Sequence, residues 1–375
     1  MAAQDARLCP VSPDQTEPFN QTKTNWRIPM KTLLKGLAIA ATMTANNAYA
    51  EGGVIKFGHD NKTDPFENPA HACTAVFSNI VTADTNGSVT VEVFGSNQLG
   101  SAAEHVQQVR DGIIQATLTS TGALASYYPR IDVLNLPFAF TGNASTYAVF
   151  DGAFGKELAA DIEAELGDVV VLGFPDTGGF FAVTNSKHSI ANLEDFDGIR
   201  IRTMTLPSHQ TIMQSLGAEA YPLAWGEVYS GLQTGVIDGQ MNPIPTISFA
   251  NFAEVQKHMT LTNHLFSPYT FMINRAFYEG LSDSERATVH TAAENCVTAS
   301  RGLSRIIEAS DRGLAGLMDK IEVTALTADQ RAAMAGAAQP AFEAHVAENM
   351  DERANELLAS FKAEVAAANA ASYLD

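Results

Sequence analysis

The stretch Gly198–Pro243, GIRIRTMTLPSHQTIMQSLGAEAYPLAWGEVYSGLQTGVIDGQMNP, decides the fold of this 375-residue chain. Its first residues, Gly198–Arg202, alternate as a short strand does, and Pro207–Leu216 then predicts a helix that ends at Gly217. Arg202 therefore stands where a strand gives way to a loop. Ligands of open α/β sheets collect at the carboxyl ends of the strands, and a guanidinium there can bind a carboxylate through two parallel hydrogen bonds. A lone arginine on a strand is more often a surface or ion-pair residue, so Arg202 needs support from the rest of the stretch.

The rest of the stretch resembles the substrate-binding proteins of TRAP transporters, the tripartite ATP-independent periplasmic uptake systems for organic acids (DctP family). The segments that carry the resemblance are Gly198–Arg202, Trp225–Tyr229, Leu232–Gly235 and Asp238–Pro243. The resemblance extends over essentially all of residues 51–375 and is most specific within residues 190–245.

The resemblance implies an α/β fold, a two-lobed periplasmic binding protein of the type II-like, Venus flytrap kind. It also implies a long lobe-spanning helix, which begins near Ser282, and a helical C-terminus. We expect lobe I to comprise residues 51–177 with 266–305, and lobe II residues 178–265 with 306–375 and the C-terminal helices.

The charge balance argues against two classes of partner. Residues 51–375 carry 39 acidic and 18 basic side chains, a net charge of −21, against −19 for the whole chain. So acidic a surface repels nucleic acid and anionic membranes. An anionic ligand must therefore be captured by a local positive site. A mature length of about 325 residues suffices for two domains.

The N-terminal region has the pattern of an export signal in an unusual position. A basic start, a short apolar core and a small-x-small cleavage site follow one another in Met30–Lys35, Gly36–Met43 and Ala48–Ala50. We predict that residues 30–50 are a signal peptide, cleaved after Ala50, and that the mature protein lies in the periplasm. Residues 1–29 are interpreted as a leader translated upstream of the true start. The alternative is a disordered leader on a cytosolic protein.

Three cysteines occur in the sequence, and one of them, Cys9, belongs to the leader. An oxidising compartment would allow Cys73 and Cys296 to pair, but both stand in helix-like apolar surroundings and are far apart in sequence. We expect two buried free thiols rather than a disulfide.

Strands and helices alternate along the chain. Strands are predicted at Val54–Phe57, Val89–Phe94, Ile113–Leu118 and Val169–Leu172. A helix is expected over His71–Asp84, and capping boxes open further helices at Ser101, Ser282 and Thr327. The fully apolar strand Val169–Leu172 is expected to be buried in a central sheet.

An internal repeat supports two similar lobes. Val109–Ala116 and Leu232–Gly239 both run from a helix end through a capping glycine into an apolar strand, although chance similarity is an alternative over so few residues. We expect the chain to cross between the lobes through Pro175–Gly179 and near Asn263–Tyr269, because both segments are rich in turn formers that can absorb hinge rotation.

Motifs of the common enzyme classes are missing. Gly152–Glu157 is faintly like a phosphate loop but has the wrong spacing and no Ser or Thr after Lys156. Asp60–Pro65 is not a calcium loop, because Lys62 and Pro65 stand where an oxygen ligand and a glycine are needed. We therefore expect no catalysis, no cofactor and no metal.

The resemblance assigns the predicted site in lobe II. Arg202 matches the arginine that binds the ligand carboxylate in the family, and Asn242 matches the asparagine that adds a hydrogen bond. Trp225 either packs against the ligand or fills the core of its lobe.

Lobe I is expected to contribute residues that follow its strands. These are His59, Asp60 and Asn61 after the first strand and Ser120 and Thr121 after the Ile113–Leu118 strand. Each is placed near the ligand, with a helix cap as the alternative role.

The expected ligand is a small carboxylate with an apolar or neutral remainder. Some relatives carry a second arginine in the region that is Phe180–Ala182 here, and Phe181 is counted with the site. The chain is also similar to ectoine-binding members, but Ala123 and Thr246 replace the aromatic residues that enclose the ring there, and Met241 replaces a glutamate.

As partners, the resemblance implies the small and large membrane subunits of a cation-driven permease, and we expect a monomer. One alternative is a periplasmic sensing module that hands its ligand-bound state to a signalling receptor. Another is an ectoine-like compatible-solute binder within the same family. An enzyme that turns over the bound acid is the third class.

Overall fold

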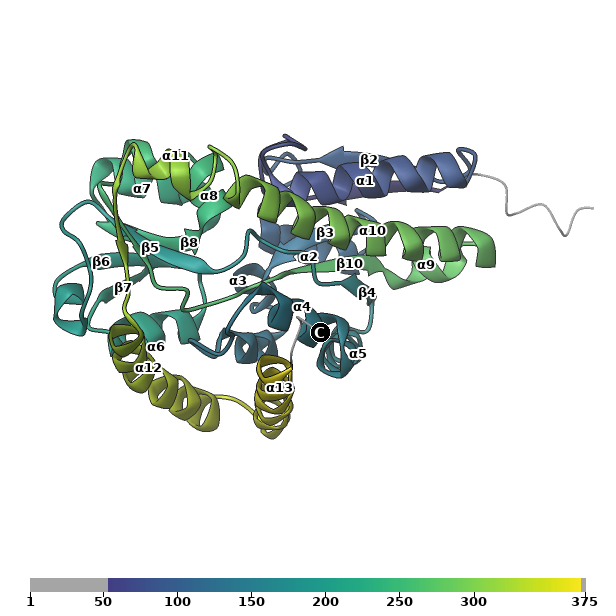
Figure 1. Cartoon of the computed structure of the whole chain (residues 1–375). Helices are drawn as coiled ribbons and strands as arrows, with labels where there is room; N and C mark the ends of the chain where they lie inside the picture. Colours follow the sequence, from purple (N-terminus) through teal and green to yellow (C-terminus); the bar gives the residue numbers. More distant parts are fainter. Residues whose placement is uncertain (1–52, 372–375) are drawn as a thin grey trace, which may run out of the picture. The chain divides into compact units, whose positions relative to one another are not determined.

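The computed structural model describes residues 53–371, which form two mixed β-sheets with helices around them (Figure 1). The first sheet has the order β2–β1–β3–β10–β4, with strands β1 (Val54–Gly58), β2 (Thr90–Phe94), β3 (Ala116–Ser120), β4 (Val169–Gly173) and β10 (Tyr269–Asn274). The second has the order β11–β9–β5–β8–β6–β7, with β5 (Phe181–Asn185), β6 (Arg200–Thr203), β7 (Glu219–Pro222), β8 (Gly239–Pro243), β9 (His258–Leu261) and β11 (Glu322–Ala325). The predicted leader, signal peptide and Cys9 lie outside the described residues.

Both sheets repeat one topology, so the predicted two-lobed α/β fold is confirmed. In the first sheet β1 pairs in parallel with β2 and β3, and in the second β6 pairs in parallel with β7 and β8. An antiparallel strand then joins each set, β10 beside β3 and β5 beside β8. Gly112 and Gly235 precede β3 and β8, and both have a φ of +72°. The sequence repeat therefore marks the same position in the two lobes.

The helices predicted from capping boxes begin where expected, whereas the helix predicted at His71–Asp84 begins two residues earlier, at Pro69. The helices of the first lobe are α1 (Pro69–Asp84), α2 (Ala102–Arg110), α3 (Thr121–Leu124), α4 (Asn143–Asp151), α5 (Ala153–Leu166) and the 3₁₀ helix η1 (Pro129–Asn135). The others are α6 (Pro207–Ser215), α7 (Val228–Thr234), α8 (Ile244–Phe249), α9 (Arg275–Gly280), α10 (Asp283–Glu308), α11 (Leu314–Met318), α12 (Ala328–Asn349) and α13 (Glu352–Ala370). All three predicted capping boxes, at Ser101, Ser282 and Thr327, are present. Among the helices described, none is long and apolar enough to cross a membrane.

The long helix α10 contacts both lobes, as predicted. It lies along α1 and packs on β4 of the first sheet, and it also packs on α8, which follows β8 of the second sheet (Figure 1). Near its C-terminus Arg305 donates a hydrogen bond to the carbonyl of Gly178, where the chain enters the second lobe. The helix therefore spans the boundary between the two sheets.

The expectation of two free thiols is wrong, because Cys73 and Cys296 form a disulfide. Cys73 lies on α1 and Cys296 on α10, and both side chains are fully buried. The 223 residues that separate them in sequence do not separate them in space, because the two helices pack side by side on the first sheet.

Two predicted strands differ from those observed. The strand predicted at Ile113–Leu118 begins only at Ala116, because residues 112–115 form a turn in which Ile113 is 61% exposed. Val169–Leu172 is a strand but not a central one. It is the edge strand β4, paired only with β10, so Val170 and Val171 are half-buried rather than enclosed.

The two segments that link the sheets are hydrogen-bonded to each other. Thr177 Oγ1 donates to the carbonyl of Ser267 at 2.8 Å, and the amide of Tyr269 donates to the carbonyl of Pro175 at 2.8 Å. The hinge role expected of these two linking segments remains a prediction. The lobe boundaries given above remain a prediction.

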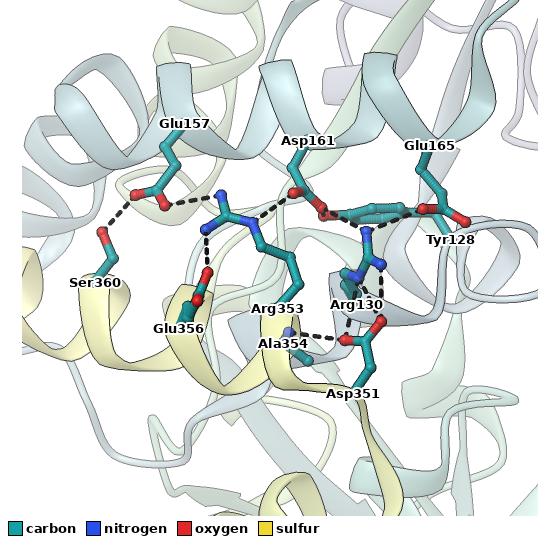
Figure 2. A network of polar contacts seen from close by, with 10 residues as sticks. All are labelled: Tyr128, Arg130, Glu157, Asp161, Glu165, Asp351, Arg353, Ala354, Glu356 and Ser360. Carbon is teal, nitrogen blue, oxygen red and sulfur yellow. Dashed lines mark hydrogen bonds and ion pairs between the residues drawn. The ribbon is translucent and has the colours of Figure 1, made fainter.

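The last two helices, α12 and α13, also contact elements of both lobes. Helix α12 packs on α6, whereas α13 packs on α4, α5 and η1. A charge network centred on Asp161 of α5 holds α13 in place (Figure 2). Asp161 accepts hydrogen bonds from Arg353 at 2.7 Å, from Arg130 at 3.2 Å and from the Tyr128 hydroxyl at 2.6 Å, and Arg130 also binds Asp351 at the start of α13.

We expect Asp161→Asn to lower the free energy of unfolding at neutral pH by about 2 kcal/mol, because it removes charge-assisted hydrogen bonds to two arginines. Burial raises the pKa of Asp161, but the hydrogen bonds from Arg353, Tyr128 and Arg130 outweigh it and lower that pKa below 3.8. A lowered carboxyl pKa stabilises the fold above its unfolded value, so the difference between the variant and the native protein should vanish as the pH falls through the folded pKa.

Urea denaturation at a series of pH values, from neutral pH to below the folded pKa of Asp161, measures the effect. Glu356→Gln is the matched control, because Glu356 meets the same network only at its exposed end, through Arg353, and should cost less than about 0.5 kcal/mol. A loss for Asp161→Asn that is no larger than that of Glu356→Gln would contradict the assigned role.

Candidate functional site

A cavity of about 270 Å³ opens between the two sheets at the carboxyl ends of their strands. Its walls come from the ends of β1, β2, β3, β6, β7 and β8, from the residues that follow them, and from the crossing segments. The predicted site residues that line it are Asp60, Asn61, Ser120, Phe181, Arg202, Trp225 and Asn242. The repeated topology explains this gathering, because parallel strands of both lobes end at the same place.

Arg202 is the next-to-last residue of β6, and among the described residues that line the cavity it is the only basic one. Its side chain is 3% exposed, and Nε and Nη2 both donate to the carbonyl of Leu223, at 3.0 and 2.7 Å. One edge of the guanidinium therefore holds the end of β7. Nη1 has no hydrogen-bond partner among the described residues, so the opposite end remains for a ligand. Burial lowers the pKa of Arg202 to about 10, so the group stays cationic at neutral pH.

Asp60 is the only acidic residue on the part of the cavity wall that residues 53–371 form. Asn61 fixes its carboxylate, because Nδ2 of Asn61 donates to Asp60 Oδ1 at 2.8 Å and to the Tyr269 hydroxyl at 2.9 Å. Burial raises the pKa of Asp60 to about 6, although the charge of Arg202 opposes the shift. The cavity thus holds one cation and one anion.

Asn242 lies on β8 and is one of the residues that line the cavity. Its Nδ2 donates to Oε1 of Gln240 at 2.6 Å, and its Oδ1 accepts no hydrogen bond from the described residues. The side chain of Trp225 lines the cavity and also packs on Phe249 and Phe252, so it fills the core of its lobe, while its contact with a ligand remains a prediction. Phe181 adds a further apolar surface.

Two predicted residues do not reach the cavity. His59 is fully buried beneath the loop, where Nδ1 accepts from the Asn61 amide and Nε2 donates to Nδ1 of His71 at 3.0 Å. Thr121 is also fully buried, with its hydroxyl 2.7 Å from that of Ser267. A position just after a strand therefore does not decide by itself whether a side chain faces the cavity, since Asp60 and Asn61 line it and the neighbouring His59 does not. His59 and Thr121 instead hold the loops that present the cavity residues.

Ser120 is a helix cap that also lies at the cavity. It lines the cavity, and its Oγ accepts from the amide of Ala123 at 3.4 Å as the cap of α3.

Sequence reasoning missed part of the wall. The further lining residues include Asn97, Ser101, Ser126, Thr177, Thr205, Leu223 and Tyr269. Asn97 follows β2 and Leu223 follows β7, so the rule that ligands meet strand ends would have found both if it had been applied to every strand. Tyr269 and Thr177 belong to the crossing segments, and their position depends on tertiary packing.

No group of three or more His, Cys, Asp or Glu side chains that could hold a metal ion occurs within residues 53–371. The predictions that the protein needs no metal and no cofactor remain predictions.

Two similar lobes, a cavity between them at the strand ends, and a buried arginine with a free end define the class of bacterial solute-binding proteins. The model of the family described as "Bacterial extracellular solute-binding protein, family 7" (DctP) matches residues 61–349. The chain belongs to this family, which confirms the resemblance to TRAP-transporter binding proteins.

Individual relatives agree with this membership. The chain is 33% identical to the ectoine-binding periplasmic protein TeaA of Halomonas elongata, over 77% of this chain and 84% of that one. It is 31% identical to the C4-dicarboxylate-binding periplasmic protein DctP of Rhodobacter capsulatus, over 76% and 84%. The solved structure of the sugar acid binding protein DctPAm of Advenella mimigardefordensis with galactonate is similar, with a TM-score of 0.78 and 28% identity over 85% of this chain and 99% of that one.

Proposed function

We propose that this protein captures a small organic acid with one carboxylate in the cavity between its lobes and delivers it to a membrane permease with a small and a large subunit. The observation that carries the proposal is Arg202, a buried cation that lines the cavity with Nη1 unpaired, where the described chain supplies no second basic residue. A guanidinium in a low-dielectric site binds an anion more strongly than it would in water. Asp60 then disfavours a second negative charge on the ligand.

The wall residues argue against ectoine itself. Ala123 and Thr246, where ectoine-binding members have aromatic side chains, both line the cavity. The site therefore lacks ring-enclosing side chains at those two places, which favours an open-chain acid.

Binding is proposed to proceed without chemical conversion, by closure of the lobes about the crossing segments. Both lobes supply walls, so a single small molecule can be surrounded only if they approach each other. Closure also excludes water and strengthens the contact with Arg202.

Mass spectrometry of the ligand that purified protein retains tests this function, because the ligand should be an unmodified carboxylic acid. Small-angle scattering with and without that ligand should show a smaller radius of gyration in the bound state. A non-acidic ligand, or a scattering profile that does not change at saturation, would contradict the proposal.

Export is part of the same proposal. We propose that residues 30–50 direct the chain to the periplasm and that the mature protein begins near Glu51 and acts as a monomer. The family membership and the acidic composition support this. N-terminal sequencing of periplasmic protein decides it, since an intact chain recovered from the cytoplasm would show that the signal is not used.

A further inference from the structure

A line of four buried polar side chains runs through the second sheet and ends at the cavity. It consists of Gln256, Thr184, Gln240 and Asn242, and each is 6% exposed or less. Thr184 on β5 lies directly opposite Gln240 on β8 in the antiparallel pair. Gln240 and Asn242 stand two residues apart on β8 and therefore share one face of the sheet.

At the end of the line away from the cavity, backbone carbonyls fix which atoms of the Gln256 amide donate and which accept. Nε2 of Gln256 contacts the carbonyls of Asp238 and Val255 at 3.3 and 2.9 Å. A carbonyl can only accept, so the Gln256 amide must turn its NH₂ group toward them and its Oε1 toward Thr184. The Thr184 hydroxyl consequently donates to Gln256 Oε1, at 2.8 Å.

The donor-to-acceptor direction that is set at Gln256 continues through the remaining hydrogen bonds to the ligand site. The Thr184 hydroxyl has used its hydrogen, so it can only accept from Gln240 Nε2, at 2.9 Å. Gln240 Oε1 then faces Asn242 and accepts from its Nδ2 at 2.6 Å. Each amide has one orientation that satisfies all of its neighbours. The last one, Asn242, is left with Oδ1 free of partners in the described chain and open to the cavity.

The cavity therefore presents acceptors as well as its cation. Asn242 offers Oδ1, and Asp60 offers the carboxylate oxygen that Asn61 does not engage. An acceptor left without a donor in a closed site weakens binding, and two oxygens facing each other repel. A ligand that pairs with these two acceptors must carry hydrogen-bond donors in addition to one carboxylate.

We infer that the relay Gln256–Thr184–Gln240–Asn242 locks the Asn242 oxygen toward the ligand and so makes the site select monocarboxylates that carry a hydrogen-bond donor. This inference rests on the proposed function, since it assumes a carboxylate at Arg202. Gln256, Thr184 and Gln240 are positioning residues, because they act on the ligand only through Asn242.

Calorimetry with matched acids tests the inference. The probes are hexanoate, α-hydroxyhexanoate and norleucine, which differ only in the donor on one carbon, together with galactonate and succinate. We expect the native protein to bind at least one donor-bearing monocarboxylate about tenfold or more tightly than hexanoate and succinate. The hydroxy and amino acids distinguish a hydroxyl donor from an ammonium donor.

Thr184→Val interrupts the relay, because valine keeps the shape but neither donates to Gln256 nor accepts from Gln240. With Gln240 free to turn, Asn242 loses its fixed orientation, and the preference should fall below about threefold. Thr184→Ser restores the hydroxyl and should restore the preference. Thr260→Val is the matched control, because the buried Thr260 hydroxyl bonds only the Ile190 carbonyl, outside the relay.

Circular dichroism confirms that each variant is folded, and Gln240→Leu, which breaks the relay one step nearer the cavity, replaces Thr184→Val if that variant does not fold. A preference that survives both variants overturns the inference, as does a native protein that binds hexanoate or succinate as tightly as every donor-bearing acid. In either case the proposed function stands. If none of the five probes binds, the inference falls, whereas the proposed function falls only if the ligand that purified protein retains is not a carboxylic acid.

Discussion

Arg202→Ala is expected to weaken binding of the carboxylate ligand by roughly 100-fold or more. Removing one partner of a buried charge pair costs on the order of 3–5 kcal/mol, because the other charge stays buried without compensation. Arg202→Lys keeps the charge but loses the planar fork, so its affinity should fall between those of the native protein and Arg202→Ala. Lysine also cannot hold the Leu223 carbonyl with the two nitrogens that do so now.

Arg200 supplies a matched control for this experiment. It stands two residues earlier on the same strand, but its guanidinium pairs with Asp238 at 2.7 Å and does not line the cavity. Arg200→Ala should therefore leave affinity within about threefold of the native value. Calorimetry, with circular dichroism to confirm folding, compares the variants. A folded Arg202→Ala protein with near-native affinity would show that the carboxylate binds elsewhere.

Removing the disulfide should produce the largest loss of stability. The bond between Cys73 and Cys296 closes a loop across 223 residues of sequence. A crosslink of that span lowers the entropy of the unfolded chain, and for loops longer than 100 residues the stabilisation is about 5 kcal/mol. Replacing both cysteines by alanine should accordingly lower the melting temperature by roughly 10 °C or more.

Thermal unfolding with and without a reductant measures this loss. The native protein should melt at a lower temperature once it is reduced, whereas the double alanine variant should not respond to the reductant. Thiol labelling of the unfolded chain reports whether the bond was reduced. A fully reduced native protein that melts at its oxidised temperature would contradict the expectation.

The disulfide also shows where sequence reasoning fails. Local signals were sufficient for the helix starts, because a capping box such as Ser282–Glu285 is complete within four residues. Pairing of Cys73 with Cys296 depends instead on how α1 and α10 pack, and no local pattern encodes that contact. The prediction that Val169–Leu172 is a central strand was wrong for the same reason, since an apolar run does not reveal whether a strand has one neighbour or two.

The residues that line the cavity were predicted better than the residues that hold them in place. Asp60 follows β1, whereas Arg202 and Asn242 are the next-to-last residues of β6 and β8, and the rule of strand ends places all three together. Their roles depend on neighbours that the rule does not name. The relay through Thr184 requires the register of β5 against β8, which appears only when the sheet is assembled.

The order of the strands has a consequence for any attempt to divide this molecule. The first sheet is completed by β10, which the chain reaches only after it has built most of the second sheet. The two lobes are therefore interleaved, and no single cut releases either one as a continuous piece of polypeptide. A gene fragment ending before Tyr269 would leave β3 and β4 without the strand between them. Exposed strand edges of this kind pair with other chains, so such a fragment is a candidate for aggregation rather than for independent folding.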